Sequence, residues 1–129
     1  MRILLDTHIF LWYISDDRRL SKELHYKIRD TNNEVYLSVV SIWESIVKHQ
    51  IGKLPFPESP EKYLSKQRTF HKISSLELDE PSVCKLIQLP EIHRDPFDRM
   101  LVCQALQHNL KIATVDEKVR AYPIDCVES

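Results

Sequence analysis

Three aspartates stand directly after apolar segments of this sequence or near the start of one, and carboxylates so placed are candidates for binding a metal ion. Asp6 follows the short run Ile-Leu-Leu, and Asp116 follows the similar run Ile-Ala-Thr-Val. Asp98 lies near the start of a longer segment, His-Arg-Asp-Pro-Phe-Asp-Arg-Met-Leu-Val-Cys-Gln-Ala. The elements that position these acids decide whether their side chains meet.

Asp98 is placed by a helix that we predict over residues 96–109. Asp95 followed by Pro96 is typical of an N-cap and a first helical residue, so Asp98 is the third helical residue. At about 100° per residue, four apolar side chains lie within about 80° of it: Leu101, Val102, Ala105 and Leu106. An acid at a helix start is favourable by up to about 1 kcal/mol, but that does not explain its place on the buried face. We therefore expect Asp98 to line a polar pocket with other acids.

Apolar runs alternate with helical segments along the chain, which predicts a three-layer α/β/α fold with a central, mainly parallel sheet. The predicted strands cover residues 3–5, 35–38, 72–75 and 111–115, with a final edge strand over 124–127. The predicted helices cover residues 7–14, 22–29, 41–51, 60–67, 80–89, 96–109 and 117–121. In such sheets, ligands bind beyond the carboxyl ends of the strands, where helix N-termini also point. Asp6, Asp98 and Asp116 all belong to that edge.

Glu44 is a fourth candidate, early in the helix predicted over residues 41–51. Its helical angle puts it at the border of a face formed by Trp43, Ile46, Val47 and Gln50. Lys48 lies four residues further on. An exposed ion pair worth about 0.3 to 0.5 kcal/mol therefore explains Glu44 equally well when this residue is taken alone.

Taken together, the four acids point to a bound cation. Two carboxylates about 5 Å apart repel by on the order of 3 kcal/mol at an effective dielectric constant near 20, so a cluster needs a counter-charge. Oxygen ligands without paired Cys or His residues favour Mg²⁺ or Mn²⁺ over zinc. Such an ion lowers the pKa of a bound water and neutralises phosphoryl oxygens, which suits phosphodiester hydrolysis.

Length and composition predict one soluble domain over residues 1–129. The formal net charge of −1 gives no general attraction to nucleic acid, so a polyanion would need a local basic patch or a metal. Cys84, Cys103 and Cys126 are odd in number and widely spaced, and we expect buried thiols in a reducing cytoplasm. No apolar run approaches membrane-spanning length, so we expect no membrane association.

Four segments, in order, resemble the motifs of the PIN-domain ribonucleases, and most closely those of the VapC-like toxins of bacterial toxin-antitoxin pairs. They are Ile-Leu-Leu-Asp-Thr-His at 3–8, Ser-Ile-Trp-Glu at 41–44 with Lys48 and Gly-Lys-Leu at 52–54 behind it, His93–Ala105, and Ala-Thr-Val-Asp-Glu-Lys-Val at 113–119. The resemblance covers nearly the whole chain. One small departure is Cys103, where an alanine is common.

The resemblance implies a Mg²⁺- or Mn²⁺-dependent endoribonuclease that acts on RNA, forms a homodimer and is held inactive by a cognate antitoxin. The acidic tetrad of the family falls on Asp6, Glu44, Asp98 and Asp116. In the leading hypothesis, Asp6 and Asp98 bind the cation and Asp116 completes the coordination directly or through water. Glu44 then orients or deprotonates the attacking water.

Other polar residues near the proposed site have simpler interpretations. Asp95 is more readily an N-cap than a fifth ligand. Arg99 could pair with Asp95 or contact phosphate, and the sequence does not decide between the two. Thr114 is two residues before Asp116, on the same side of an extended chain, and its hydroxyl could support a ligand. His8 and His93 are expected to be structural, without a catalytic role.

Aromatic and basic residues give weaker signals. Trp12, Trp43 and Phe97 are expected in the core rather than in a platform for base stacking. A basic rim for RNA could be formed by Lys48, Lys53, Lys66, Arg68 and Lys72, although scattered lysines usually lie on a solvated surface.

Two competing functions remain open from the sequence. An aspartyl phosphatase would use Asp6 as nucleophile, but that type of site needs a second Asp two residues on, where this chain has His8. A non-catalytic partner-binding module would use the acids only to tune stability. That second alternative predicts no response to divalent metal.

Overall fold

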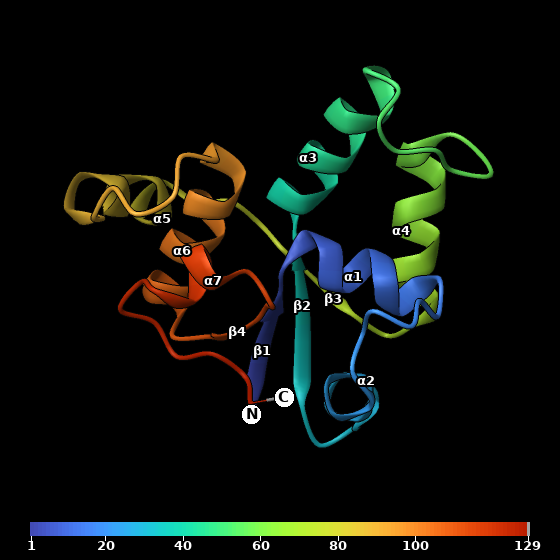
Figure 1. Ribbon diagram of the computed structural model, residues 1–129, viewed down its shortest axis with the longest axis horizontal. Coiled ribbons are helices and arrows are strands. Elements are labelled where there is room, and N and C mark those ends of the chain that lie inside the picture. Colours follow the sequence, from blue (N-terminus) through green and yellow to red (C-terminus); the bar gives the residue numbers. More distant parts are fainter. Residues whose placement is uncertain (129) are drawn as a thin grey trace.

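The computed structural model describes residues 1–128 and, within them, a four-stranded parallel sheet with the strand order β3-β2-β1-β4 (Figure 1). The strands are β1 (Arg2–Leu5), β2 (Glu34–Ser38), β3 (Ser74–Leu76) and β4 (Lys111–Ala113). The chain proceeds from β1 outward through β2 to β3 and then returns to place β4 on the other side of β1. The order therefore reverses between β1 and β4, and ligands of open α/β sheets bind at such a reversal.

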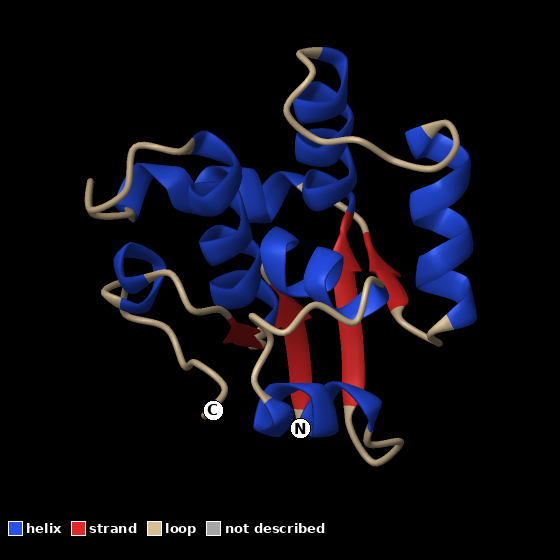
Figure 2. Ribbon diagram, turned by 45° about the vertical axis from the view of Figure 1, so that its right-hand side comes forward, coloured by secondary structure: helices blue, strands red, loops and turns tan. Residues whose placement is uncertain are grey.

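Helices cover both faces of this sheet (Figures 1 and 2). They are α1 (Thr7–Ile14), α2 (Lys22–Arg29), α3 (Val39–Gln50), α4 (Pro60–Phe70), α5 (Glu80–Cys84), α6 (Pro96–His108) and α7 (Glu117–Arg120), with the 3-10 helix η1 (Lys85–Gln88) after α5. In Figure 1, α1, α2 and α4 lie to the right of the strands, whereas α5, α6 and α7 lie to the left.

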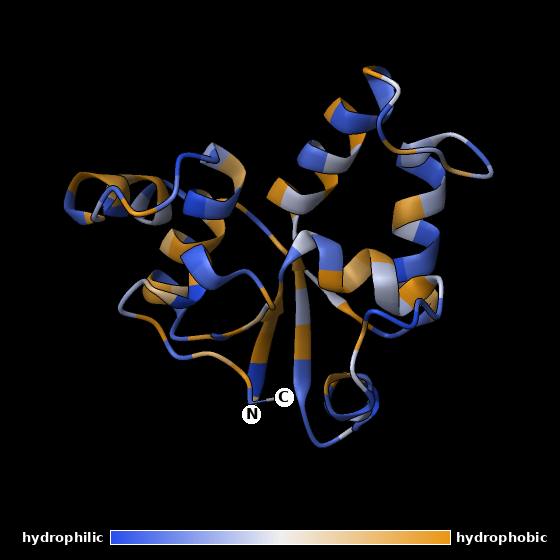
Figure 3. Ribbon diagram, in the orientation of Figure 1, coloured by the Kyte–Doolittle hydropathy of each residue, from blue (hydrophilic) through white to orange (hydrophobic). Residues whose placement is uncertain are grey.

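The pleat of β1 explains the two helical layers. Ile3 and Leu5 are fully buried and pack with side chains of α1, α2 and α4. Leu4, between them, packs with side chains of α6 and α7 on the opposite face. A strand buried on both faces has a continuous apolar sequence, which is visible as the hydrophobic centre of β1 in Figure 3. The predicted three-layer α/β/α class with a parallel sheet is confirmed.

The ends of the helices follow their capping residues. Asp95 accepts hydrogen bonds from the amides of Phe97 and Asp98 and begins α6, as predicted. α3 begins at Val39, two residues earlier than expected, because the Ser38 hydroxyl accepts a 3.0 Å hydrogen bond from the Val40 amide. After α3, Gly52 has a φ of +78°, a left-handed conformation that glycine adopts readily after the end of a helix.

Two predictions about the periphery were wrong. Residues 124–127 do not form an edge strand but make a single parallel bridge, between Cys126 and Ile112, because this segment hydrogen-bonds to β4 only through the backbone of Ile112. Of the three thiols, all unpaired, Cys103 is buried, but Cys84 is exposed and Cys126 is half-buried. Within residues 1–128, none of the helices has both the length and the apolar character needed to cross a bilayer.

The orientation of α3 also differs from the prediction. Its buried residues are Val40, Ser41, Glu44 and Ser45. Trp43, expected in the core, is 57% exposed. The small polar face of α3 points inward because Ser41 and Glu44 make hydrogen bonds with the buried Thr7 hydroxyl. Hydrophobicity alone therefore gave the wrong face of this helix.

Candidate metal centre

The carboxyl ends of β1 and β4 bring the first and last predicted acids to the same edge of the sheet. The Asp6 amide donates to the Ala113 carbonyl at 3.0 Å, which extends the pairing of the two strands by one step. Thr114 is 1% exposed, and its hydroxyl donates to Asp6 Oδ2 at 2.6 Å. The same hydroxyl accepts the Asp116 amide at 3.0 Å. Thr114 thus links the two aspartates, as its predicted supporting role requires.

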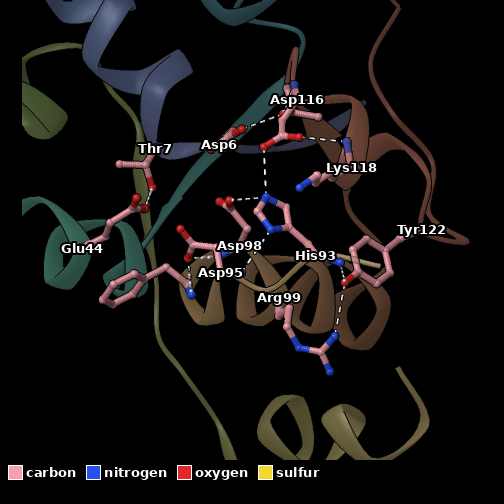
Figure 4. A network of polar contacts seen from close by, with 12 residues as sticks. Asp6, Thr7, Glu44, His93, Asp95, Asp98, Arg99, Asp116, Lys118 and Tyr122 are labelled. Atoms are coloured by element: carbon pink, nitrogen blue, oxygen red, sulfur yellow. Dashed lines mark hydrogen bonds and ion pairs between the residues drawn. The ribbon is translucent and has the colours of Figure 1, made fainter. Parts of the chain in front are cut away.

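Asp98 reaches this edge from the first turn of α6 and meets Asp116 at a histidine (Figure 4). His93 Nε2 lies 3.0 Å from Asp98 Oδ2 and 3.1 Å from Asp116 Oδ2. One possible ligand atom from each of these three residues lies within 4.8 Å of the others. Asp98 is thus not an isolated helix-start acid but part of a cluster.

Asp6 is the most deeply buried acid of the sheet edge. Its side chain belongs to a residue that is 5% exposed, and Oδ1 has no hydrogen-bond partner among the residues that the structure describes. Although Asp6 is the N-cap of α1, its side chain makes no capping hydrogen bond. Burial raises the pKa of this carboxyl, and the Thr114 hydrogen bond offsets part of that rise. An unpartnered buried carboxylate oxygen is unfavourable unless a cation contacts it.

Asp98 and Asp116 have opposite pKa shifts. Burial raises the pKa of Asp98 to about 8, and the neighbouring charges of Asp6, Asp95, Glu44 and Asp116 add to the effect. Burial also acts to raise the pKa of Asp116, but hydrogen bonds from the Lys118 amide and His93 outweigh it and hold that pKa below its usual range. Without a cation, one acid of this pair is therefore protonated near neutral pH and the other is ionised.

Glu44 is 2% exposed and lies on the Thr7 side of Asp98 (Figure 4). The Thr7 hydroxyl lies 2.7 Å from Glu44 Oε1, and Lys48 Nζ forms an ion pair with Oε2. Burial lowers the pKa of Lys48, but its bond to Glu44 and the charges of Asp95 and Asp98 outweigh this and raise it. The Glu44–Lys48 ion pair that the sequence offered as an exposed alternative is thus present, but its glutamate is buried and its lysine is close enough to Asp95 and Asp98 to respond to their charges.

The structure also places the other polar residues that the sequence analysis considered. Asp95 is the predicted N-cap. Arg99 does not pair with Asp95 but donates to the Pro90 carbonyl at 3.0 Å and to the Tyr122 hydroxyl at 3.3 Å. His8 is exposed on α1 and lies beside Trp12, with 6.2 Å between ring centroids.

His93, which the sequence analysis placed near the site as a structural residue, is in direct contact with the acids. Its side chain is 14% exposed and contacts two of the predicted acids. The nearest signal in the sequence was its position two residues before the N-cap Asp95, from which a side chain can turn back over the helix start. Periodicity could not show this contact because His93 lies in a loop, outside any helix or strand.

Aromatic and basic residues near the centre differ from expectation. Trp43 stands next to Glu44, and its ring meets that of Phe97 edge-on with 4.8 Å between centroids. Phe97 and Trp12 are half-buried, so none of the three rings is fully in the core. Lys48 lies at the acids, whereas Lys66 belongs to α4 and pairs with Glu58 in the loop before it. Figure 1 places α4 on the opposite side of α3 from α6.

The residues present fit a hard divalent cation. Asp6 offers an unpartnered oxygen, Asp98 holds a proton that a cation would displace, and Asp116 offers a third carboxylate nearby. Oxygen ligands of this kind suit Mg²⁺ or Mn²⁺. The cluster lies at the reversal point of the strand order, where the N-termini of α1, α6 and α7 also converge.

The sequence profile of the PIN domain matches residues 3–124. The chain belongs to the PIN domain family, whose members are generally nucleases that use divalent metal. No curated protein sequence gives a significant match.

Solved structures share the fold at low sequence identity. VapBC2 from Rickettsia felis, bound to a DNA fragment from its promoter, is 18% identical with a TM-score of 0.68, over 99% of this chain and 98% of that one. FitAcB from Neisseria gonorrhoeae is 20% identical with a TM-score of 0.64, over 98% and 96% of the two chains. FitAB bound to an IR36 DNA fragment is 19% identical with a TM-score of 0.66, over 97% and 93%.

Proposed function

We propose that this chain, as a single PIN domain over residues 1–129, is a Mg²⁺- or Mn²⁺-dependent endoribonuclease that hydrolyses RNA phosphodiester bonds. The observation that carries the proposal is the meeting of three carboxylates at one sheet edge. One of them has an unpartnered buried oxygen, and another has a pKa raised to about 8. Such an arrangement is unfavourable on its own and becomes favourable when a divalent cation neutralises it.

The roles follow from the contacts. Asp6, Asp98 and Asp116 hold the cation, which when bound activates water and neutralises phosphoryl charge. Thr114 fixes Asp6 through the 2.6 Å hydrogen bond, so that Oδ1 remains free for the cation. Glu44 accepts a proton from the attacking water at a carboxylate oxygen, and Lys48 and Thr7 hold this carboxylate in position.

We further propose that the nuclease is the toxin of a toxin-antitoxin pair and works in the cytoplasm as a homodimer bound by its antitoxin. The motif resemblance to VapC-like toxins supports this role. The similarity in fold to VapBC2 and FitAB assemblies, which are described with DNA fragments, is consistent with it. Coexpression with the neighbouring reading frame, followed by size-exclusion chromatography with light scattering, tests both partner and stoichiometry.

The decisive experiment is cleavage of a labelled RNA of mixed sequence, beside DNA of the same sequence, with Mn²⁺, Mg²⁺ or EDTA. The parent should cut RNA only with metal, and Asp98→Asn should lose at least about 100-fold in rate, since one ligand carboxylate is gone. Asp79→Asn is the matched control: it also neutralises an aspartate at the start of a helix, the N-cap of α5, and asparagine keeps the cap. Metal-independent cleavage, or an Asp98→Asn variant as fast as the parent, would contradict the proposal.

The same samples separate the alternatives. Turnover of a small phosphate ester with a phosphorylated Asp6 would favour the phosphatase. A melting temperature indifferent to Mn²⁺, together with no cleavage of RNA, would favour the partner-binding module.

A further inference from the structure

We propose that His93 is a positioning residue of the metal centre: its ring N–H holds Asp98 and Asp116 together, and the ring is not itself a metal ligand. This inference rests on the proposed function, because it concerns how the proposed carboxylate ligands are held. Proximity alone would suggest the opposite, since His93 Nε2 lies within 4.8 Å of both carboxylate oxygens and could be counted as a ligand.

The position of the ring proton follows from the backbone. The Asp95 amide donates a 3.1 Å hydrogen bond to His93 Nδ1. A nitrogen that accepts a hydrogen bond must carry a lone pair, so Nδ1 has no proton in this arrangement. The tautomer that fits this contact carries its ring proton on Nε2, as set by the bond that the other nitrogen makes.

Nε2 lies beside carboxylates from two different elements. It makes a 3.1 Å hydrogen bond with Asp116 Oδ2, at the start of α7, and Asp98 Oδ2, on α6, lies 3.0 Å away. One ring nitrogen is thus in contact with oxygens of two proposed ligands that belong to separate segments of the chain. His93 thereby fixes the position of these two oxygens relative to each other.

The loop that carries His93 is itself anchored. The His93 amide donates to the Tyr122 hydroxyl at 2.8 Å, and Tyr122 is 3% exposed. Arg99 donates to the same hydroxyl and to the Pro90 carbonyl, at the start of the loop. In Figure 4 these contacts form one chain from Arg99 through Tyr122 and His93 to the acids.

Coordination through Nε2 would break this arrangement. The Nε2 proton would have to leave or move to Nδ1, and a proton on Nδ1 would face the Asp95 N–H that now donates to it. Asp95 and Asp98 share the start of α6, so the loss of that bond would disturb the same turn that positions the Asp98 ligand. The contacts therefore assign metal binding to carboxylate oxygens and ligand orientation to the histidine.

The first test needs no substitution. In ¹⁵N-detected NMR of the metal-free parent, His93 should show an unprotonated Nδ1 and a protonated Nε2. A ring proton on Nδ1 in place of Nε2 would overturn the inference.

The second test measures Mn²⁺ affinity by calorimetry. His93→Ala should weaken binding by about 10- to 100-fold, the usual effect of losing a partner that orients a ligand. His93→Gln, whose amide N–H₂ can still donate, should regain part of that loss. The matched control is His108→Ala, which removes a histidine from a comparable aspartate contact, 2.8 Å from Asp79 Oδ2, on α5. This control should bind Mn²⁺ like the parent.

The third test is pulsed EPR of the Mn²⁺-loaded parent, which detects a directly bound imidazole nitrogen by its strong hyperfine coupling. No such coupling is expected, and finding one would overturn the inference. Parent-like affinity in His93→Ala, or a His93→Gln variant no better than His93→Ala, would also overturn it while leaving the metal proposal intact. A parent that binds no Mn²⁺ would overturn the proposed function and this inference together.

Discussion

Thr114 Oγ1 lies 2.6 Å from Asp6 Oδ2, and this hydrogen bond joins residues 108 positions apart in the sequence. It is made where β1 and β4 end side by side, and both residues are at most 5% exposed. The hydroxyl satisfies one carboxylate oxygen and leaves the other without a partner among the described residues. The same pair of residues thus makes a structural hydrogen bond and leaves one carboxylate oxygen available for the proposed cation.

Thr114→Val should therefore destabilise the protein by about 1–3 kcal/mol, because it removes the partner of a buried carboxylate oxygen and leaves the Asp116 amide without its acceptor. Thr114→Ser, which keeps the hydroxyl, should remain within about 1 kcal/mol of the parent. Urea unfolding of the metal-free proteins measures both values. Equal stability of the valine variant and the parent would show that the hydrogen bond contributes little.

The raised pKa of Asp98 predicts how the metal-free protein responds to pH. The carboxyl has a folded pKa of about 8 and an ordinary value of 3.8, so between these values the folded state holds a proton that the unfolded state releases. Stability of the metal-free protein should therefore fall as pH rises through this window. A cation displaces the proton, so the increase in melting temperature with Mn²⁺ should be larger at pH 8 than at pH 6.

Asp98→Asn supplies the comparison for this pH dependence. The variant has no carboxyl to titrate at this position, so its metal-free stability should depend less on pH, and it should exceed that of the parent at pH 8. A parent whose stability rises from pH 5 to pH 8 as steeply as that of the variant would contradict the predicted pKa.

Removing only the lysine of the Glu44–Lys48 pair should destabilise the protein more than removing both charges. Lys48→Met leaves the buried Glu44 carboxylate without its cation and should cost about 1–3 kcal/mol, less than for a fully buried pair because Lys48 is 31% exposed. The double variant Glu44→Gln/Lys48→Met removes both charges and should recover part of that loss. Chemical denaturation of the two proteins decides the point, and a double variant less stable than Lys48→Met would contradict it.

Because Trp43 is largely exposed, replacing it should lower the stability of the protein only slightly. Trp43→Ala removes a ring that is 57% exposed and meets Phe97 edge-on, a type of contact worth about 0.5–1.5 kcal/mol. Phe10→Ala, a substitution in the core where the side chain is 1% exposed, should cost about 3–5 kcal/mol. Thermal and urea unfolding of the two variants compare them directly, and similar losses would mean that Trp43 is buried in solution.

The sequence by itself determined the alternation of strands and helices, the parallel α/β/α class and the acids at the strand ends. These features follow from local causes: a strand buried on both faces must be apolar throughout, and Asp95-Pro96 begins a helix whatever surrounds it. The positions of Asp6 and Asp116 followed because parallel strands end at one edge, and that of Asp98 followed because helix N-termini point to the same edge.

Only the tertiary structure decided which partners these acids have. The inward face of α3 depends on the Thr7 hydroxyl, a residue of another helix, so periodicity placed Trp43 inside and Glu44 at the border. The role of His93 depends on a loop folded back over α6, where the Asp95 amide fixes the ring and two carboxylates converge on Nε2. Such contacts join segments that are distant in the chain. Their geometry is set by packing, and a local pattern of residue types carries no information about it.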